Sequence, residues 1–281
     1  MPRAIPHFCN IGGHNVIPFT QGILFTGENR ALESSGLSEE SFIREFNVNT
    51  GETIRYVMLN PGHFAEGCAI VVEPSSLALY VMVLTYKNEL VLLYDYATFE
   101  LRHMFTIGTM GFGLTSNYDF RKVITKDFVA QQKVWMTTGD ERLVSLVIPE
   151  SFSKGAVTMG DAITITMNQR PLAHVNELEY VHQSDTIYAN IWLTNYIVEI
   201  DYRTGECVNM WDLSSIASLQ PHYVDVLNGI ASNPSNDALL ITGKHWPYMY
   251  FVKLYKREST VPRYTEALTD RIMREKNSIK H

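Results

Sequence analysis

The sequence predicts an all-β fold: a five-bladed β-propeller with four-stranded antiparallel blades and a short C-terminal helix. Three observations predict it. Short alternating or β-branched runs dominate the chain, and turn residues separate them at short intervals. A weak repeat built around glycine also recurs at spacings of roughly 45 to 65 residues. Units of about 40 to 50 residues that hold four short strands are typical of propeller blades.

The composition fits one large folded domain. The 281 residues are 46% hydrophobic and 19% charged, which is enough apolar material for a substantial core. The net charge of -7 argues against a nucleic-acid partner. The longest uncharged apolar run, Pro74–Tyr86, is too short to span a membrane. We expect a single monomeric domain over residues 1–281, with blades over roughly 19–256 and a helical tail over 257–281.

The predicted strands are short and lie between turn signals. They cover Ile23–Phe25, Ala78–Thr85, Leu90–Tyr94, Val144–Ile148, Ile163–Met167, Ile187–Trp192 and Leu239–Thr242. Two helices are expected, and both look peripheral. One lies near Trp211–Leu219, and the other is Thr265–Lys276, in which Leu268, Ile272 and Met273 offer an apolar face.

Two ordered series of short strings define the repeat. The first is a glycine followed by apolar residues, at Gln21–Leu24, Glu66–Ala69, Phe112–Thr115, Asn176–Glu179 (where Glu177 replaces the glycine) and Asn228–Ala231. The second marks a turn near the far end of a unit, at Asn49–Glu52, Ala97–Glu100, Ser151–Lys154 and Arg203–Glu206. The two series share one period and indicate five blades, with an insertion near Met167–His174 behind the longest spacing.

The repeat predicts a pocket near the propeller axis. The first strand of each blade lines the central channel, so Gln21, Glu66, Phe112, Asn176 and Asn228, which open these strands, converge on one face. Antiparallel pairing brings the end of each second strand to the same face, namely Tyr86, Trp192 and Lys244. We expect one carboxylate, one ammonium and several amides, and an aromatic wall to which Phe19, Phe64 and Trp246 also contribute.

Position alone leaves a purely structural interpretation open. Glycines at blade starts serve tight backbone geometry, polar residues can hydrate the axis, and aromatic residues pack between blades. The chain has no His-Glu-x-x-His and no Gly-x-Ser-x-Gly motif. Its three cysteines, Cys9, Cys68 and Cys207, fit neither a disulfide framework nor a zinc site. The sequence therefore predicts neither a metal site nor a cofactor.

Six strings, in the same order from Phe19 to about Leu254, carry a resemblance to a known family. They are Phe19–Phe25, Phe64–Gly67, Asn176–Tyr180, Tyr188–Trp192, Asp225–Ala231 and Thr242–Pro247. Together they closely resemble the plant and bacterial type of glutaminyl-peptide cyclotransferase. The resemblance implies a five-bladed propeller that converts the N-terminal glutamine of peptides or proteins to pyroglutamate with release of ammonia, without a metal. It also implies action in the secretory pathway or outside the cell, although Met1-Pro2-Arg3 opens no signal peptide.

The resemblance assigns roles to the pocket residues. It makes Glu66, Asn176 and Lys244 catalytic, and Phe19, Gln21, Phe64 and Trp192 substrate-binding. Tyr86 and Phe112 stand where the plant enzymes have tryptophan, so we expect a pocket of altered width. We expect Asp225, Asn228 and Trp246 to support the pocket from behind.

A mechanism follows as a hypothesis. Glu66 would act as general base and then general acid, with a pKa raised by its aromatic surroundings and lowered by Lys244. Lys244, helped by Asn176 or Gln21, would stabilise the oxyanion. Two alternatives stay open: a non-catalytic propeller that binds peptide N-termini or a protein partner, and a sugar hydrolase. The hydrolase would need paired carboxylates, and only Glu66 has a matching channel position.

Overall fold

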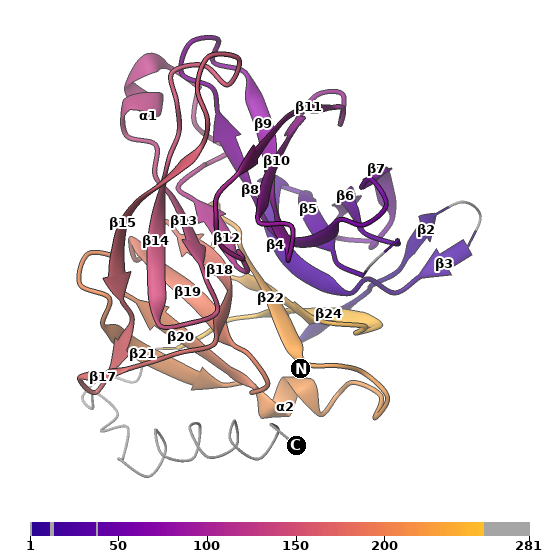
Figure 1. The fold of residues 1–281 in the computed structure, drawn as a ribbon. Coiled ribbons are helices and arrows are strands. Elements are labelled where there is room, and N and C mark those ends of the chain that lie inside the picture. Colours follow the sequence, from indigo (N-terminus) through magenta and orange to yellow (C-terminus); the bar gives the residue numbers. More distant parts are fainter. Residues whose placement is uncertain (1, 12–13, 38, 256–281) are drawn as a thin grey trace.

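The protein is a ring of five four-stranded antiparallel sheets around a central axis (Figure 1). A computed structural model describes residues 2–11, 14–37 and 39–255. The predicted fold class, a five-bladed propeller, is confirmed. The predicted C-terminal helix, Thr265–Lys276, lies outside the described residues.

Four blades are formed by consecutive strands, and the order of strands from the axis outward is the order along the chain. The first blade contains β4 (Thr20–Gly27), β5 (Arg30–Ser35), β6 (Phe42–Asn47) and β7 (Thr53–Met58). The second contains β8 (Phe64–Val72), β9 (Leu79–Tyr86), β10 (Leu90–Asp95) and β11 (Leu101–Thr106). The third contains β12 (Leu114–Ser116), β13 (Val134–Thr137), β14 (Arg142–Val147) and β15 (Thr158–Thr164). The fourth contains β18 (Val175–Val181), β19 (Thr186–Ile191), β20 (Tyr196–Ile200) and β21 (Cys207–Asp212).

The fifth blade joins the two ends of the described chain. It contains β22 (Leu227–Ser232), β23 (Leu239–Gly243), β24 (Tyr248–Val252) and β1 (Arg3–Pro6). β1 pairs antiparallel with β24, from Arg3 opposite Phe251 to Pro6 opposite Tyr248. The expected start of the blades at residue 19 is therefore corrected: their outermost closing strand comes from residues 3–6, a segment too short and too proline-rich to show alternation.

The innermost strands contact one another around the axis, in the ring order β4, β8, β12, β18, β22 and back to β4. The repeated glycines allow this close approach. The Gly67 N–H donates to the Phe112 carbonyl oxygen of the next blade at 2.7 Å. A Cβ on Gly67 would lie 2.6 Å from that same oxygen, so no larger residue fits without a shift of the backbone.

The second repeat series marks the turns between the third and fourth strands. In the first blade the Gly51 N–H donates to the Asn47 carbonyl at 2.8 Å, and Gly51 has a φ of +78°, which favours glycine. A side chain at Gly51 would collide with the backbone of Pro6 in the preceding blade. Between the first two blades, the Arg55 side chain donates to the Ala97 carbonyl at 2.8 Å. These turns therefore hold neighbouring blades together.

The apolar core lies between adjacent blades. One cluster, for example, joins Trp135 and Leu143 of the third blade to Val175, Ile187 and other residues of the fourth. Each neighbouring pair of blades shares such a cluster, including the fifth and first, where Ile5 of β1 packs with Ile23 and Phe46. Burial on both faces explains why many inner strands are apolar throughout rather than alternating.

Smaller elements connect the blades. The hairpin of β16 (Thr166–Met167) and β17 (Arg170–Pro171) occupies the predicted insertion, so the predicted strand Ile163–Met167 is divided between β15 and β16. α2 (Ser214–Ala217) lies inside the predicted helical segment but is shorter, because β21 extends to Asp212. The hairpin of β2 (Cys9–Ile11) and β3 (His14–Val16), and α1 (Lys126–Ala130), were not predicted. Neither described helix is long and apolar enough to cross a membrane.

Candidate active site

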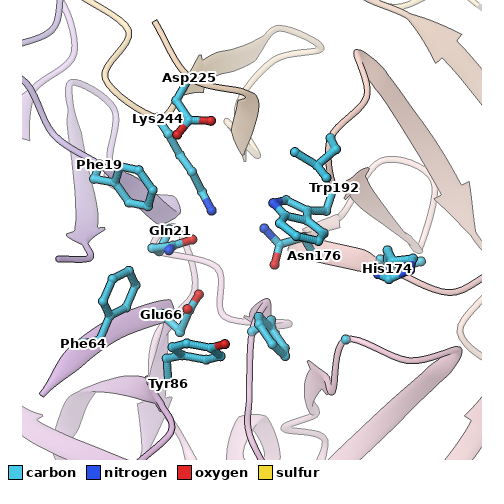
Figure 2. A pocket seen from close by; sticks show the side chains of 14 residues that line it. Phe19, Gln21, Phe64, Glu66, Tyr86, His174, Asn176, Trp192, Asp225 and Lys244 are labelled. Carbon is cyan, nitrogen blue, oxygen red and sulfur yellow. The ribbon is translucent and has the colours of Figure 1, made fainter. Parts of the chain in front are cut away.

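A cavity of about 440 Å³ opens at the end of the channel where the innermost strands begin. Figure 2 shows side chains converging on it from several blades. Its lining contains the predicted residues Phe19, Gln21, Phe64, Glu66, Tyr86, Phe112, Asn176, Trp192, Asp225 and Lys244, together with Gly139, His174, Val175 and Leu193. The structure therefore gathers in one place most of the residues that the repeat and the resemblance selected.

Strand irregularities direct the polar side chains into the cavity. The pairing of β8 with β9 places Phe64 opposite Tyr86 and then shifts register between Ala65 and Cys68, so Glu66 lies in a β-bulge. The first strands of the first, fourth and fifth blades shift register at the corresponding place. Bulges re-aim side chains and are frequent beside active sites.

Glu66 presents a buried carboxyl group to the cavity. The residue is 4% exposed, and among the described residues its carboxyl makes neither a hydrogen bond nor an ion pair within 4 Å. Burial raises the pKa of Glu66 to about 8, and the charge of Lys244 opposes the rise. A carboxyl group with such a pKa can both take and return a proton near neutral pH.

Lys244 enters the cavity from the opposite side, with its ammonium pointing inward (Figure 2). It is 6% exposed, and its Nζ lies 4.9 Å from the centre of the Phe19 ring, which gives a cation–π contact. Burial lowers the pKa of Lys244, opposed first by Glu66 and then by Asp225. Because the ammonium and the Glu66 carboxyl do not pair directly, a substrate group has room between them.

Two amide side chains complete the polar part of the cavity. Asn176 Nδ2 donates to Asn228 Oδ1 at 2.9 Å, and Asn228 Nδ2 donates to the Thr20 carbonyl at 2.9 Å. This chain of bonds fixes the orientation of the Asn176 amide. Gln21 is 3% exposed, and its Oε1 is buried without a hydrogen-bond partner in the described structure. The cavity thus contains an acceptor that lacks a donor.

The aromatic side chains form a continuous wall along one side. Ring centres are separated by 6.2 Å between Phe19 and Phe64, 5.9 Å between Phe64 and Tyr86, and 5.7 Å between Tyr86 and Phe112. Trp192 lies at the mouth and is 42% exposed. An apolar wall with one exposed edge suits a ligand whose first residue is enclosed while the rest of its chain leaves the pocket.

The three expected supporting residues differ in position. Asn228 and Trp246 lie outside the cavity lining, and the Trp246 indole N–H donates to the Asp225 carbonyl oxygen at 2.9 Å. Asp225 itself lines the cavity with an exposed carboxylate, in contrast to the expected position behind it. The reason is that Asp225 precedes β22, in the connection that forms the cavity edge.

The pocket predicted from the sequence did not include four of the lining residues, namely Gly139, His174, Val175 and Leu193. Leu193 and His174 have positive φ angles of 62° and 64°, and the His174 and Trp192 rings lie 5.9 Å apart. No local pattern signals a positive φ at leucine or histidine, so the backbone conformation of this rim was not predictable. Gly139 lies against the Phe112 ring, where an added Cβ would come within 2.6 Å of a ring carbon.

No three His, Cys, Asp or Glu side chains are grouped to bind a metal ion in the part of the chain that the structure describes. The cavity instead offers one carboxyl group with a raised pKa, one buried ammonium and a buried acceptor oxygen. This set can transfer a proton, stabilise a developing negative charge and hold an N–H group.

Comparisons with known proteins agree with this geometry. A family model described as glutamine cyclotransferase matches residues 3–254. The chain is 26% identical over 263 residues to a glutaminyl-peptide cyclotransferase of Arabidopsis thaliana, covering 90% of this chain and 72% of that protein. The crystal structure of a Myxococcus xanthus glutaminyl cyclase superposes with a TM-score of 0.68 at 26% identity, covering 89% of this chain and 94% of that one.

Proposed function

The chain belongs to the glutamine cyclotransferase family, and from this premise we propose how its cavity performs the reaction. The family expected from the resemblance is thereby confirmed, and the chain is a glutaminyl-peptide cyclotransferase, an acyltransferase. Its substrates are peptides or proteins with an N-terminal glutamine, which it would convert to pyroglutamate with release of ammonia. The observation that carries the mechanism is a buried Glu66 and a buried Lys244 that share one cavity without pairing.

The substrate supplies both reacting groups, since its α-amine attacks the carbonyl carbon of its own side-chain amide. The pocket has to hold the side chain folded back, which converts the attack into a well-oriented intramolecular step. The aromatic wall from Phe19 to Phe112 supports this role, because it offers flat apolar surface to the methylene groups and excludes water.

Glu66 handles the proton. A free α-amine has a reference pKa of about 7.7 to 8.0, so much of it is protonated at neutral pH and cannot attack. The pKa of Glu66, raised by burial to about 8, matches this value closely, so proton transfer from the ammonium to the carboxylate costs little. The new C–N bond forms a tetrahedral intermediate whose ring nitrogen carries one surplus proton. Glu66 returns its proton to the departing nitrogen, the old C–N bond breaks, and ammonia leaves. The re-formed Glu66 carboxylate then takes the surplus proton from the ring nitrogen and passes it to the ammonia, which is released as ammonium.

Lys244 stabilises the charge that appears in between. As the amine attacks, the amide oxygen becomes an oxyanion, and a buried ammonium interacts with it more strongly than water would. Removal of one such donor typically costs about 2.7 to 4 kcal/mol of transition-state stabilisation. The cation–π contact with Phe19 helps to keep the Lys244 ammonium inside the apolar wall.

The two amides hold the nitrogen end of the substrate. Gln21 Oε1 can only accept a hydrogen bond, so it suits an N–H of the substrate amide rather than the oxyanion. A buried acceptor without a partner costs about 1 to 3 kcal/mol, which a glutamine substrate would relieve and a glutamate substrate would not. Asn176, oriented by Asn228, would contact the α-amine. Gln21 thereby favours an amide over an acid.

We propose that catalysis needs no metal, and one coupled assay tests both the activity and this point. Ammonia release from a glutamine-initiated dipeptide is measured with and without excess chelator. We expect turnover that the chelator leaves unchanged, and a loss of at least about 100-fold in Glu66→Gln and in Lys244→Ala. Glu179→Gln is the matched control, because Glu179 is a buried carboxyl with a raised pKa that does not line the cavity.

Three outcomes would contradict the proposal. Absence of ammonia release together with tight binding of the dipeptide would indicate a non-catalytic binding propeller. Loss of activity on chelation would reject the metal-independent mechanism. Near-normal turnover in either pocket variant would reject the assigned roles. The compartment is a separate proposal that rests on family resemblance alone: the secretory pathway or the extracellular space.

A further inference from the structure

Lys244 lies in the turn between β23 and β24, and this turn is hydrogen-bonded to segments outside that hairpin. The Lys244 N–H donates to the Val226 carbonyl at 2.9 Å, and Lys244 forms an isolated bridge with Phe19. The next N–H, that of His245, donates to the Pro18 carbonyl at 2.9 Å. The segment before the first blade therefore contacts this turn directly, and its position bears on the position of the ammonium.

His7, in the segment that precedes the first blade, also contacts this turn. Its backbone N–H donates to the Pro247 carbonyl at 2.9 Å, and its side chain is completely buried. Nδ1 lies 2.7 Å from the Trp246 carbonyl oxygen, and Nε2 lies 2.7 Å from Glu33 Oε1. A carbonyl oxygen can only accept, so Nδ1 must carry a hydrogen.

Glu33 is the hydrogen-bond partner of the other ring nitrogen, Nε2. It is completely buried, and it also accepts from Thr20 Oγ1 at 2.6 Å and from Arg44 Nε at 2.7 Å. Burial acts to raise the pKa of Glu33, but the charges of His7 and Arg44 outweigh it and lower the pKa to about 2. The ionised carboxylate can only accept, so each ring nitrogen of His7 faces an acceptor: Nδ1 the Trp246 carbonyl and Nε2 the Glu33 carboxylate.

Two considerations indicate that His7 does more than hold β1 against the fifth blade. Apolar side chains would hold a strand at least as well, since buried ion pairs seldom add net stability over hydrophobic residues. The His7 ring, however, joins two specific places: the Trp246 carbonyl, two residues after Lys244, and Glu33, which also binds Thr20, the neighbour of Gln21. The bonds thus run from the ammonium side of the cavity to its amide side.

We propose that His7 is a positioning residue, which fixes the Lys244 turn against the first blade and so sets where the ammonium lies relative to the bound amide. It touches no substrate. The kinetic test of this role rests on the proposed function, whereas the hydrogen-exchange test described below does not. Because Lys244 is assigned to charge that exists only in the transition state, a displaced ammonium lowers kcat more than it raises KM.

The kinetic experiment compares His7→Gln with Tyr96→Phe. Glutamine can donate toward only one of the two acceptors at a time, and a displacement of about 1 Å can cost 100-fold in rate. We therefore expect His7→Gln to lower kcat by roughly 10- to 100-fold per folded molecule, with a change in KM below about threefold. The assay is ammonia release from a glutamine dipeptide, with folded protein quantified by tryptophan fluorescence.

Tyr96→Phe is the matched control. The Tyr96 hydroxyl donates at 2.7 Å to Glu45, a buried carboxylate that also accepts from Thr26 and Arg55, as Glu33 accepts from its three donors. None of these four residues lines the cavity. We expect this variant to lose stability but to keep its kcat, so a loss of kcat specific to His7→Gln reports position rather than folding.

Hydrogen exchange measured by mass spectrometry gives a reading that needs no activity. The amides of residues 244–246 are bonded in the native turn, so His7→Gln should speed their exchange at least tenfold while the strands of the third blade stay protected. A folded His7→Gln protein with the kcat of the wild type, or with unchanged exchange at 244–246, would overturn the inference. Failure of the wild type to release ammonia would instead overturn the proposed function, and the exchange result would still stand.

Discussion

Glu66 should make the protein less stable than it would be with a neutral residue in its place. Its pKa rises from an ordinary 4.5 to about 8 on burial, and each unit corresponds to about 1.4 kcal/mol. The folded state therefore binds this proton more tightly than the unfolded state. The resulting stability is fully present below pH 4.5 and is lost as the pH rises toward 8.

The magnitude of the effect in Glu66→Gln follows from these values. Glutamine is close in shape and cannot ionise, so it escapes the penalty. The free energy of unfolding of the variant should equal that of the wild type near pH 4.5, exceed it by about 3 kcal/mol at pH 7, and exceed it by up to about 5 kcal/mol above pH 8. The same substitution is expected to lower turnover by at least about 100-fold, so stability and activity should change in opposite directions.

Urea denaturation at several pH values between 4 and 9 measures this difference in unfolding free energy. Equal m values for the two proteins, that is, equal dependence of the unfolding free energy on urea concentration, exclude a change in the unfolded state. Glu45→Gln is a control of opposite sign, because the hydrogen bonds and ion pair of buried Glu45 lower its pKa despite the burial. That variant should be destabilised at neutral pH. A Glu66→Gln protein whose extra stability is absent, or is the same at every pH, would refute the reasoning.

Two further changes give independent tests. Lys244→Met removes the charge that opposes the rise of the Glu66 pKa, so the midpoint of the Glu66 titration should move above about 8. Carbon-13 NMR of the Glu66 carboxyl group measures this midpoint, and an unchanged value would show that the two groups do not interact. Gly67→Ala places a methyl group 2.6 Å from the Phe112 carbonyl oxygen and should lower the unfolding free energy, measured in urea, by about 1 to 3 kcal/mol. Gly27→Ala is the control: no atom lies closer than 3.7 Å to the added methyl group, so the loss should be under about 1 kcal/mol. Equal losses in the two variants would contradict the close approach of the inner strands at Gly67.

The sequence predicted the features of the fold that repeat. Four strand starts are marked by glycine, because close approach of the inner strands needs a residue without a side chain. The corresponding position of the fourth blade is informative as well. There Glu177 replaces glycine, and its carboxylate accepts the Ile23 N–H at 3.4 Å and the Ile230 N–H at 3.0 Å. A buried carboxylate that bridges blades has no pattern in the local sequence.

The candidate site was predictable to the extent that it follows from strand pairing. Phe64 and Tyr86, far apart in sequence, meet because they are partners in an antiparallel pair. By contrast, the link from His7 to Glu33 and Trp246 depends on how the first and fifth blades meet in space, and periodicity does not report contacts between blades. The position of Asp225 at the cavity edge depends on an irregular connection in the same way.

The pairing of β1 with β24 has a consequence for biosynthesis. Residue 3 leaves the ribosome long before residue 251, yet the two are partners in one sheet, so this contact is strongly non-local. Early blades can form while translation continues, since domains and their parts begin to fold from the N-terminus. The Lys244 turn, however, gains its contact with His7 only after the last blade has emerged. Activity should therefore appear late, when β24 has emerged and has paired with β1.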